Sequence, residues 1–443
     1  MNGLIIGMDL CDSCTHISCQ GQDTIWSFPT RIGKEPDSDV WRVAEESAGG
    51  ALEGMVVEDK LLSLAMKDGT ATIDGVRYEG LYLLKMFLKQ VLAIPRQASG
   101  KEEIENLVIT VPKLEVKLLD CLMYCADFLE IDRSRVHVIS HAESFVYYVM
   151  SQKREVWSNQ VGMFELSENG LHYYELRVQR GLRQMQVVAD QEELEESFHL
   201  NVLDSDAGIQ MADRILSSCA ERLLQKRLFS AIILTGRGFA QTDWASDFMQ
   251  QICKRRRVFA EMDVFTRGAL IRSEDLCEAQ SSYHFTCICE GRLKTTVSLK
   301  IQEREKEGQL VLASAGDSWY ETKMTAEFIV SGTPEVEFSL QPLEPRKKKT
   351  VKIPLEGFPK RPDRTTRIEM AFGFTGEDTM IVMIRDLGFG ELFPATNRMI
   401  KQEVSLRQKL KGLQKMIAQN KNSLWNCICS AMPDCGDRDI GKQ

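Results

Sequence analysis

Thiols are the first side chains in this sequence that could do chemistry, and they gather at two places. Cys11 and Cys14 lie near the start, and Cys427, Cys429 and Cys435 lie near the end. Thiolate zinc sites usually need two CxxC pairs at a fixed spacing, and neither group offers them. We therefore predict ordinary thiols at both places and no metal site.

The number and setting of the cysteines also indicate a compartment. The chain has 13 cysteines, an odd number, and many lie inside apolar patterns, as Cys121 and Cys125 do. This is typical of reduced thiols and not of a disulfide framework. No run approaches the roughly 20 apolar residues that span a bilayer, and the apolar start at residues 4–6 predicts a strand rather than a signal peptide. We expect a cytoplasmic protein with no membrane contact.

Composition limits the classes of partner. The 443 residues are 43% apolar and 27% charged, with a formal net charge of −9. A chain of this length exceeds what one hydrophobic core usually organises, so several domains are expected. The negative charge disfavours sequence-independent binding to nucleic acid. A protein partner is more compatible with this balance.

Polar turns interrupt apolar strands in a repeated pattern. Residues 4–18 predict a strand, a turn and a second strand, and residues 161–177 predict a second strand-turn-strand unit. A further turn follows the apolar strand at residues 231–234. The turn residues of the second and third units are Ser167, Glu168, Asn169, Gly170, Gly236 and Gly238.

The segments between and after these turns complete the predicted organisation. Residues 106–150 alternate strand, helix, strand and helix, which favours a mostly parallel sheet covered by helices. After residue 277 short alternating strands predict a separate β domain. Residues 397–420 carry apolar side chains on one helical stripe, which predicts a helix that packs on the β domain rather than pairing with a second chain.

The order of these motifs resembles the superfamily of actins, sugar kinases and seventy-kilodalton heat-shock chaperones. Residues 7–13 (GMDLCDS) are similar to the chaperones' first phosphate loop, GIDLGTT, and residues 161–176 are similar to the second, VFDLGGGTFDVSIL. The strand at 107–112, the segment ISHAESFV at 139–146, the strand IILTG at 232–236 and the helix at 264–271 also match in order. The resemblance covers about residues 1–277.

The resemblance implies a fold and its boundaries. We expect an α/β protein with a two-lobed, actin-like ATPase fold, built from duplicated ribonuclease-H-like halves at residues 1–155 and 156–280. Segments at 353–359 and 367–374 resemble the chaperones' peptide-binding sandwich, so residues 281–393 are expected to form a β-sandwich-like domain. A short C-terminal helix and tail would occupy residues 394–443, where the chaperones carry a much longer lid.

The resemblance also implies a ligand, which is ATP or ADP with magnesium. In this family glycine-rich turns cradle the phosphates through backbone N–H groups. Carboxylates at Asp9 and Glu165 would position metal-bound water. The implied nucleotide contacts are Asp9, Cys11, Asp12, Ser13, Ser167, Glu168, Asn169, Gly170, Gly236 and Gly238.

The sequence departs from the family at the positions that would touch phosphate. Asp12 and Glu168 place carboxylates there, and a carboxylate about 4 Å from a phosphate oxygen costs roughly 4 kcal/mol at an effective dielectric near 20. The penalty vanishes if the two side chains point away from the cleft. The family's catalytic glutamate falls on His141, with Glu143 two residues later, and we expect His141 to cap a helix rather than to act as a base.

Three hypotheses of function follow. The leading one is a chaperone-like protein with a degenerate nucleotide-binding domain that acts as a protein-binding or nucleotide-sensing module. The first alternative is an active magnesium-dependent ATPase of the chaperone type, with Asp9 and Glu165 as its metal-positioning groups. The second alternative is an actin-like scaffold protein.

Overall fold

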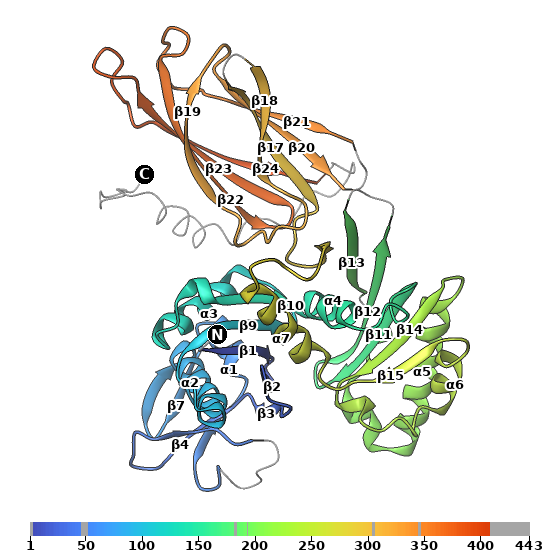
Figure 1. Cartoon of the computed structure of the whole chain (residues 1–443). Coiled ribbons are helices and arrows are strands. Elements are labelled where there is room, and N and C mark those ends of the chain that lie inside the picture. The colour runs from blue at the N-terminus through green and yellow to red at the C-terminus, as the bar shows by residue number, and fades with distance from the viewer. Residues whose placement is uncertain are drawn as a thin grey trace. The chain divides into compact units, whose positions relative to one another are not determined.

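The computed structural model describes residues 3–45, 52–180, 184–192, 194–303, 306–343 and 347–407. The chain forms two compact units, with the boundary between Glu290 and Gly291 (Figure 1). The first unit contains two mixed sheets with helices, and the second contains antiparallel sheets. None of the helices in the described ranges combines the length and apolar character that crossing a membrane requires.

The first sheet has the strand order β10-β9-β1-β2-β3. β1 pairs with β2 in antiparallel fashion and with β9 in parallel fashion, so the expected opening hairpin is confirmed. The sheet is mixed rather than mostly parallel, because the hairpin strands lie beside the parallel ones. The strands are β1 (Leu4–Leu10), β2 (Cys14–Cys19), β3 (Trp26–Pro29), β9 (Ile104–Val111) and β10 (Val136–Ser140).

The second sheet repeats this arrangement, in the order β15-β14-β11-β12-β13-β16. β11 pairs with β12 as a hairpin and with β14 as a parallel neighbour, which confirms the second predicted hairpin. β16, from the segment predicted to begin the β domain, adds a strand parallel to β13. The strands are β11 (Gln160–Ser167), β12 (Gly170–Gln179), β13 (Met185–Glu192), β14 (Phe229–Thr235), β15 (Arg257–Ala260) and β16 (Phe285–Ile288).

Helices cover both faces of the first sheet. Met8 and Ile109 face α2 (Gly80–Ser99) and α3 (Val116–Phe128), because alternate strand residues point to opposite faces. Val108 points the other way and contacts Ala269 of α7 (Val264–Cys277). Gly7 allows this close approach, since a Cβ there would lie 2.2 Å from the backbone nitrogen of Leu270.

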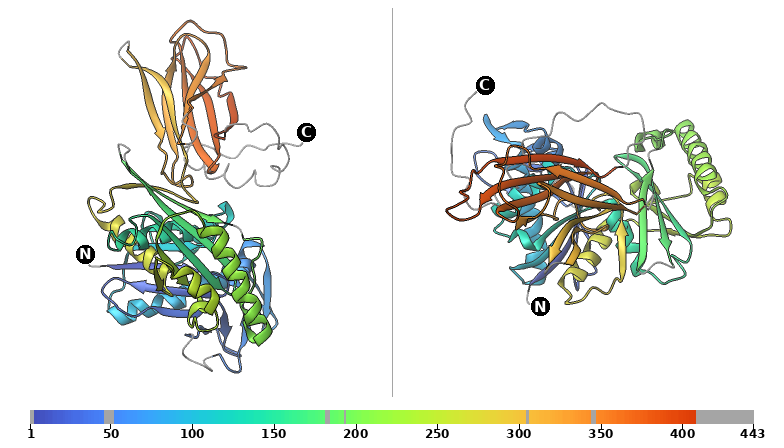
Figure 2. Two further views of the ribbon diagram at one scale, coloured as in Figure 1. Left: turned by 90° about the vertical axis from the view of Figure 1, so that its right-hand side faces the viewer. Right: turned by 90° about the horizontal axis from the view of Figure 1, so that it is seen from above.

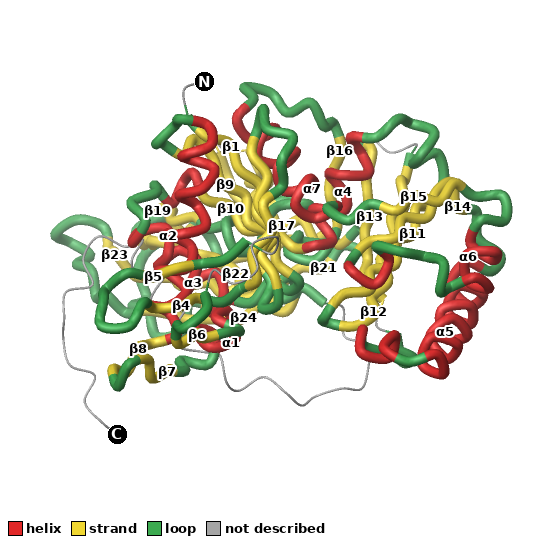
Figure 3. The backbone as a smooth tube through the Cα atoms, turned by 90° about the horizontal axis from the view of Figure 1, so that it is seen from below, coloured by secondary structure: helices red, strands yellow, loops and turns green. Residues whose placement is uncertain are grey.

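The second sheet is covered in a related way. α5 (Asp206–Leu224) and α6 (Ser246–Ile252) pack on the face that bears Phe164 and Leu234. α4 (His141–Ser151) packs on the opposite face, against Met163 and Ile233. α4 and α7 therefore lie between the two sheets (Figure 3).

These two central helices are exchanged between the sheets. α4 follows β10 of the first sheet but packs in the core of the second, whereas α7 follows the second sheet's strands and packs on the first. They cross at Gly268, where an added Cβ would lie 2.0 Å from the carbonyl oxygen of Ser144. The crossing therefore requires glycine.

Short elements complete the first unit. β7 and β8 form a hairpin, and β4 lies between β5 and β6. They are α1 (Leu61–Met66), β4 (Ile32–Lys34), β5 (Trp41–Arg42), β6 (Val56–Glu58), β7 (Thr70–Ile73), β8 (Val76–Glu79) and the 3₁₀ turns η1 (Arg133–Arg135), η2 (Leu200–Asp204) and η3 (Arg237–Phe239).

The second unit consists of two four-stranded antiparallel sheets that lie face to face (Figure 2, left). One has the order β18-β17-β20-β21 and the other β19-β22-β23-β24. The strands are β17 (Thr295–Glu303), β18 (Lys306–Ala313), β19 (Met324–Val330), β20 (Glu335–Pro342), β21 (Lys349–Pro354), β22 (Thr366–Gly376), β23 (Thr379–Gly388) and β24 (Met399–Ser405).

The helix predicted at residues 397–420 is wrong over its first part. Met399–Ser405 is strand β24, which pairs with β23 along its length. The edge of β23 offers a row of backbone hydrogen-bonding groups, and pairing with them outweighs a local helical periodicity. Residues 408–420 of the predicted helix lie outside the described residues.

Candidate functional site

The candidate site lies where the parallel strands of the first sheet end. Asp9 is near the end of β1, and His141 directly follows β10 as the first residue of α4. Because the carboxyl ends of parallel strands meet at one edge of a sheet, the two residues come together although 132 positions separate them. Ser140, and not His141 as predicted, caps α4, since its hydroxyl accepts from the backbone N–H of Glu143 at 3.2 Å.

Asp9 and His141 form a buried ion pair. Nε2 of His141 lies 2.8 Å from a carboxylate oxygen of Asp9, and the residues are 2% and 7% exposed. Burial opposes both charges, but the attraction between them raises the pKa of His141 and lowers the pKa of Asp9. The imidazole also stacks on Phe265, with ring centroids 3.8 Å apart and an interplanar angle of 13°.

Cys11 is the third member of this cluster. Its Sγ lies 3.5 Å from the carboxylate oxygen of Asp9 and 3.8 Å from Nε2 of His141. Burial, together with the charges of Asp9 and Glu165, raises the pKa of the Cys11 thiol well above its usual value. The thiol therefore stays protonated, and its S–H group donates a hydrogen bond to the carboxylate of Asp9.

The cluster does not have the geometry of a cysteine nucleophile. Such a site needs the thiol at one imidazole nitrogen and the carboxylate at the other. Here Cys11 and Asp9 both approach Nε2 of His141, and Nδ1 has no hydrogen-bond partner among the described residues.

Glu165 occupies the position in the second sheet that Asp9 occupies in the first. Asp9 lies opposite His16 in its hairpin, and Glu165 lies opposite His172 in the second hairpin. The carboxylate of Glu165 accepts from the hydroxyl of Ser167 at 3.0 Å and from that of Tyr174 at 3.3 Å. The side chain is thus engaged on both oxygens.

Asp12 is held by the short helix α1. One carboxylate oxygen accepts from the backbone N–H of Ser63 at 2.8 Å, and the other accepts from the Ser63 hydroxyl. Ser63 lies in the first turn of α1, whose own N-cap residue, Lys60, makes no side-chain cap. Asp12 therefore caps α1 from a distance. Its neighbour Ser13 accepts a hydrogen bond from the backbone N–H of Thr30 at 3.1 Å.

Glu168 forms an ion pair with the turn that follows the predicted strand at residues 231–234. Its carboxylate lies 3.4 Å from a guanidinium nitrogen of Arg237, which stands between Gly236 and Gly238. Both glycines pack against Leu166, because an added Cβ would lie 2.5 Å from its carbonyl oxygen at the first and 2.4 Å from its side chain at the second.

The remaining residues of the second predicted loop form the tip of its hairpin. Ser167 pairs with Gly170, which has a φ of 105°. Asn169 is an exposed turn residue at this tip. The predicted contacts are therefore divided. Asp9 and Cys11 lie in a buried cluster with His141, whereas residues 167–170 form a hairpin tip and Gly236 and Gly238 lie in the turn that contains Arg237.

Sequence reasoning missed the partnership of His141 with Asp9 and Cys11, and the stacking of Phe265. The only signal for this site in the sequence was that His141 falls on the position of the glutamate in the chaperones' segment. A helix start in the sequence says nothing about which strand end lies beside it. The contact depends on the parallel pairing of β1, β9 and β10.

Comparison with known families defines two segments. Residues 13–290 match the family of unknown function DUF5716, in its C-terminal part. The chain belongs to this family. The DUF5716 segment ends where the first compact unit ends, at residue 290. Residues 292–406 match the domain of unknown function DUF8552. No functionally curated protein matches the chain.

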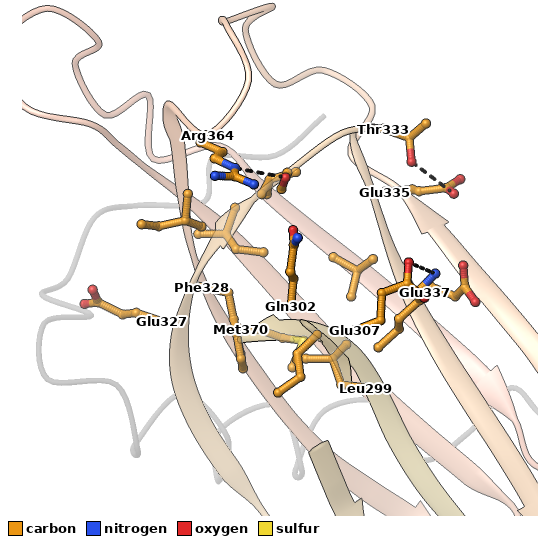
Figure 4. Close-up of a pocket in the computed structure, with 17 residues that line it drawn as sticks. Leu299, Gln302, Glu307, Glu327, Phe328, Thr333, Glu335, Glu337, Arg364 and Met370 are labelled. Atoms are coloured by element: carbon orange, nitrogen blue, oxygen red, sulfur yellow. Dashed lines mark hydrogen bonds and ion pairs between the residues drawn. The ribbon is translucent and has the colours of Figure 1, made fainter. Parts of the chain in front are cut away.

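The DUF8552 segment contains a cavity of about 800 Å³ between its two sheets (Figure 4). Side chains from β17, β19, β20 and β22 line it. Leu299, Phe328 and Met370 belong to its apolar lining. Glutamates at its rim make ion pairs with exposed cations, as Glu307 does with Lys300 at 3.2 Å. A cavity of this size can accept apolar side chains of a bound segment.

Proposed function

We propose that this chain is a chaperone-like protein that binds another protein and whose nucleotide-binding domain has lost its catalytic arrangement. The order of the five strands of the first sheet recurs in five of the six strands of the second, which supports a two-lobed, actin-like architecture with ribonuclease-H-like halves. In each half an antiparallel hairpin is followed by two parallel strands. The exchange of α4 and α7 between the sheets supports the same architecture.

The ion pair of Asp9 with His141 is the observation that carries this proposal. The family resemblance assigns Asp9 to metal-bound water and the position of His141 to a general base. Here the imidazole holds the carboxylate at 2.8 Å, and its pKa is raised. An imidazole nitrogen that is occupied by a carboxylate is not available to accept a proton from water. We therefore expect ATP or ADP with magnesium to be at most a structural or sensed ligand.

The partners of the two unexpected carboxylates are compatible with such a ligand role. Asp12 is engaged by α1, and Glu168 is paired with Arg237. Because both carboxylates already have partners, each would repel a bound phosphate less strongly than a carboxylate without one. The loss of binding free energy expected from the sequence alone is therefore reduced. Nucleotide sensing is thus compatible with the loss of turnover.

The cavity of the second unit is the proposed contact for a protein partner. β18 and β19 border it, and among the described residues each pairs on one side only, with β17 and β22 respectively. An extended segment can add to such an edge and place alternate side chains in the cavity. Apolar residues of the partner would contact Phe328 and Met370.

Calorimetry tests the nucleotide part of this proposal. The full chain is titrated with ATP and magnesium, and phosphate release is followed on the same sample. We expect no release, with or without binding. Magnesium-dependent hydrolysis that Asp9→Ala abolishes would overturn the proposal and establish the ATPase alternative.

Peptide binding tests the protein part. An array of unfolded-protein segments is probed with the full chain and with Phe328→Asp, which places a charge in the cavity. We expect the variant to lose binding. Leu392→Asp is the matched control, because Leu392 is 87% exposed and is not among the residues that line the cavity. Equal binding by Phe328→Asp would exclude the cavity as the contact.

A further inference from the structure

We propose that Asp9, Cys11 and His141 form a zinc site that ties the end of β1 to the start of α4. The three residues offer one ligand atom each, and these atoms all lie within 4.8 Å of one another. The proposal goes beyond the proposed function, because it holds whether or not nucleotide binds.

The distances between the ligand atoms match a tetrahedral metal. Zinc bonds of about 2.0–2.3 Å place neighbouring tetrahedral ligands roughly 3.3–3.6 Å apart. The thiol is 3.5 Å from the carboxylate oxygen and 3.8 Å from Nε2 of His141. The carboxylate and Nε2 are 2.8 Å apart and would separate by about half an ångström to admit the ion. This is a side-chain adjustment that leaves β1 and α4 in place.

The ligand types favour zinc over magnesium. Magnesium prefers oxygen ligands, whereas a set of one sulfur, one nitrogen and one oxygen suits zinc. The carboxylate of Asp9 and the thiolate of Cys11 together carry two negative charges, which balance Zn²⁺ in a buried place. The metal replaces the thiol proton of Cys11 and the Nε2 proton of His141, and both protons pass to solvent.

Within the described part of the chain, these three residues alone form the group of ligand atoms. Glu165 is engaged by Ser167 and Tyr174, so its oxygens are already hydrogen-bonded. The fourth tetrahedral position is then open to water, which can approach along the exposed 11% of the Asp9 side chain. Because α4 packs in the core of the second sheet, the ion would fix the first sheet to that core.

Metal binding to the full chain tests the site directly. The protein is stripped with a chelator and titrated with zinc in competition with a chromophoric chelator, and cobalt is then used as a spectroscopic probe. We expect one zinc for this site and a thiolate-to-cobalt charge-transfer band. Cys11→Ser should abolish the band and weaken zinc binding at the site by at least about 100-fold, since one of three protein ligands is lost.

Matched variants separate this site from the other thiols. Cys14→Ser and the triple change of Cys427, Cys429 and Cys435 to serine should leave the cobalt band intact. Cys11→Asp restores an anionic ligand and should recover zinc binding without the charge-transfer band, which shows that the protein is folded. Equal zinc affinity and an unchanged band in Cys11→Ser, or no zinc binding by the unaltered chain, would overturn the proposal. Neither outcome depends on the nucleotide titration.

Discussion

Nε2 of His141 lies 2.8 Å from the carboxylate of Asp9, and this contact joins the two halves of the first unit. Asp9 belongs to the first sheet, whereas the helix that His141 begins packs in the core of the second. A position that the resemblance to the chaperones would assign to catalysis therefore connects the two sheets of the first unit.

Replacing His141 with asparagine should destabilise the first unit. The change leaves the buried carboxylate of Asp9 without its cation, which costs about 3–5 kcal/mol of unfolding free energy. Urea unfolding followed by circular dichroism measures the loss. His284→Asn is the control, because His284 is exposed, and it should change the unfolding free energy by less than about 0.5 kcal/mol. Equal stability of the two variants would show that the Asp9–His141 pair adds nothing.

Asp12→Ala should loosen α1 without creating a nucleotide site. The N–H of Ser63 and its hydroxyl lose their acceptor, and loss of such a cap costs about 1 kcal/mol. Hydrogen exchange of residues 61–66 should become faster, while Asp12→Asn, which keeps an acceptor oxygen, should show a smaller effect. A large gain in ATP affinity on Asp12→Ala would instead mean that this carboxylate faces the phosphates.

Gly268→Ala should disrupt the crossing of α4 and α7. The added methyl group would lie 2.0 Å from the carbonyl oxygen of Ser144, and backbone cannot move aside as a flexible side chain can. Overpacking of this kind costs about 1–3 kcal/mol or more. Gly376→Ala is the comparison, since nothing lies within 4 Å of a Cβ there. Thermal unfolding measures the melting temperatures of both variants. An unchanged melting temperature for Gly268→Ala would contradict the close contact of α4 and α7 at this residue.

The second unit contains an ion pair whose contribution depends on pH. The carboxylate of Asp386 accepts two hydrogen bonds from Arg361, at 2.6 and 2.9 Å, and one from the Thr396 hydroxyl at 2.6 Å. Burial acts against the charge, but these partners lower the pKa of Asp386 below its ordinary value of 3.8. A lowered pKa means that the stabilisation is complete above pH 3.8 and is lost as the pH falls further.

Asp386→Asn should therefore lower the unfolding free energy at neutral pH, by about 3–5 kcal/mol, because Arg361 stays buried without its partner. The difference from the unaltered chain should shrink as the pH falls below 3.8. Urea titrations across this range measure it. Asp378→Asn removes an exposed pair with Arg407 and should cost less than about 1 kcal/mol. A constant difference at all pH values would contradict the assignment.

Local patterns predicted the elements of the fold well, and long-range partners poorly. The hairpins at β1–β2 and β11–β12 follow from alternation and polar turns, which act within a few residues. β24 was predicted as a helix, because its pairing partner β23 is invisible to a local period. His141 contacts Cys11, which is 130 positions away, and Asp12 bonds to Ser63, which is 51 positions away. No local spacing rule connects such positions.

The exchanged helices also affect how the chain can fold during its synthesis. One face of the first sheet is covered by α7, which ends at Cys277. When β1, β9 and β10 leave the ribosome, their covering helix has not yet been translated. At about 5–20 residues per second, the 137 residues from the end of β10 at Ser140 to the end of α7 at Cys277 take about 7–27 seconds. We therefore expect the nascent chain to carry an exposed apolar sheet face during that interval, which makes it prone to aggregation until α7 is made.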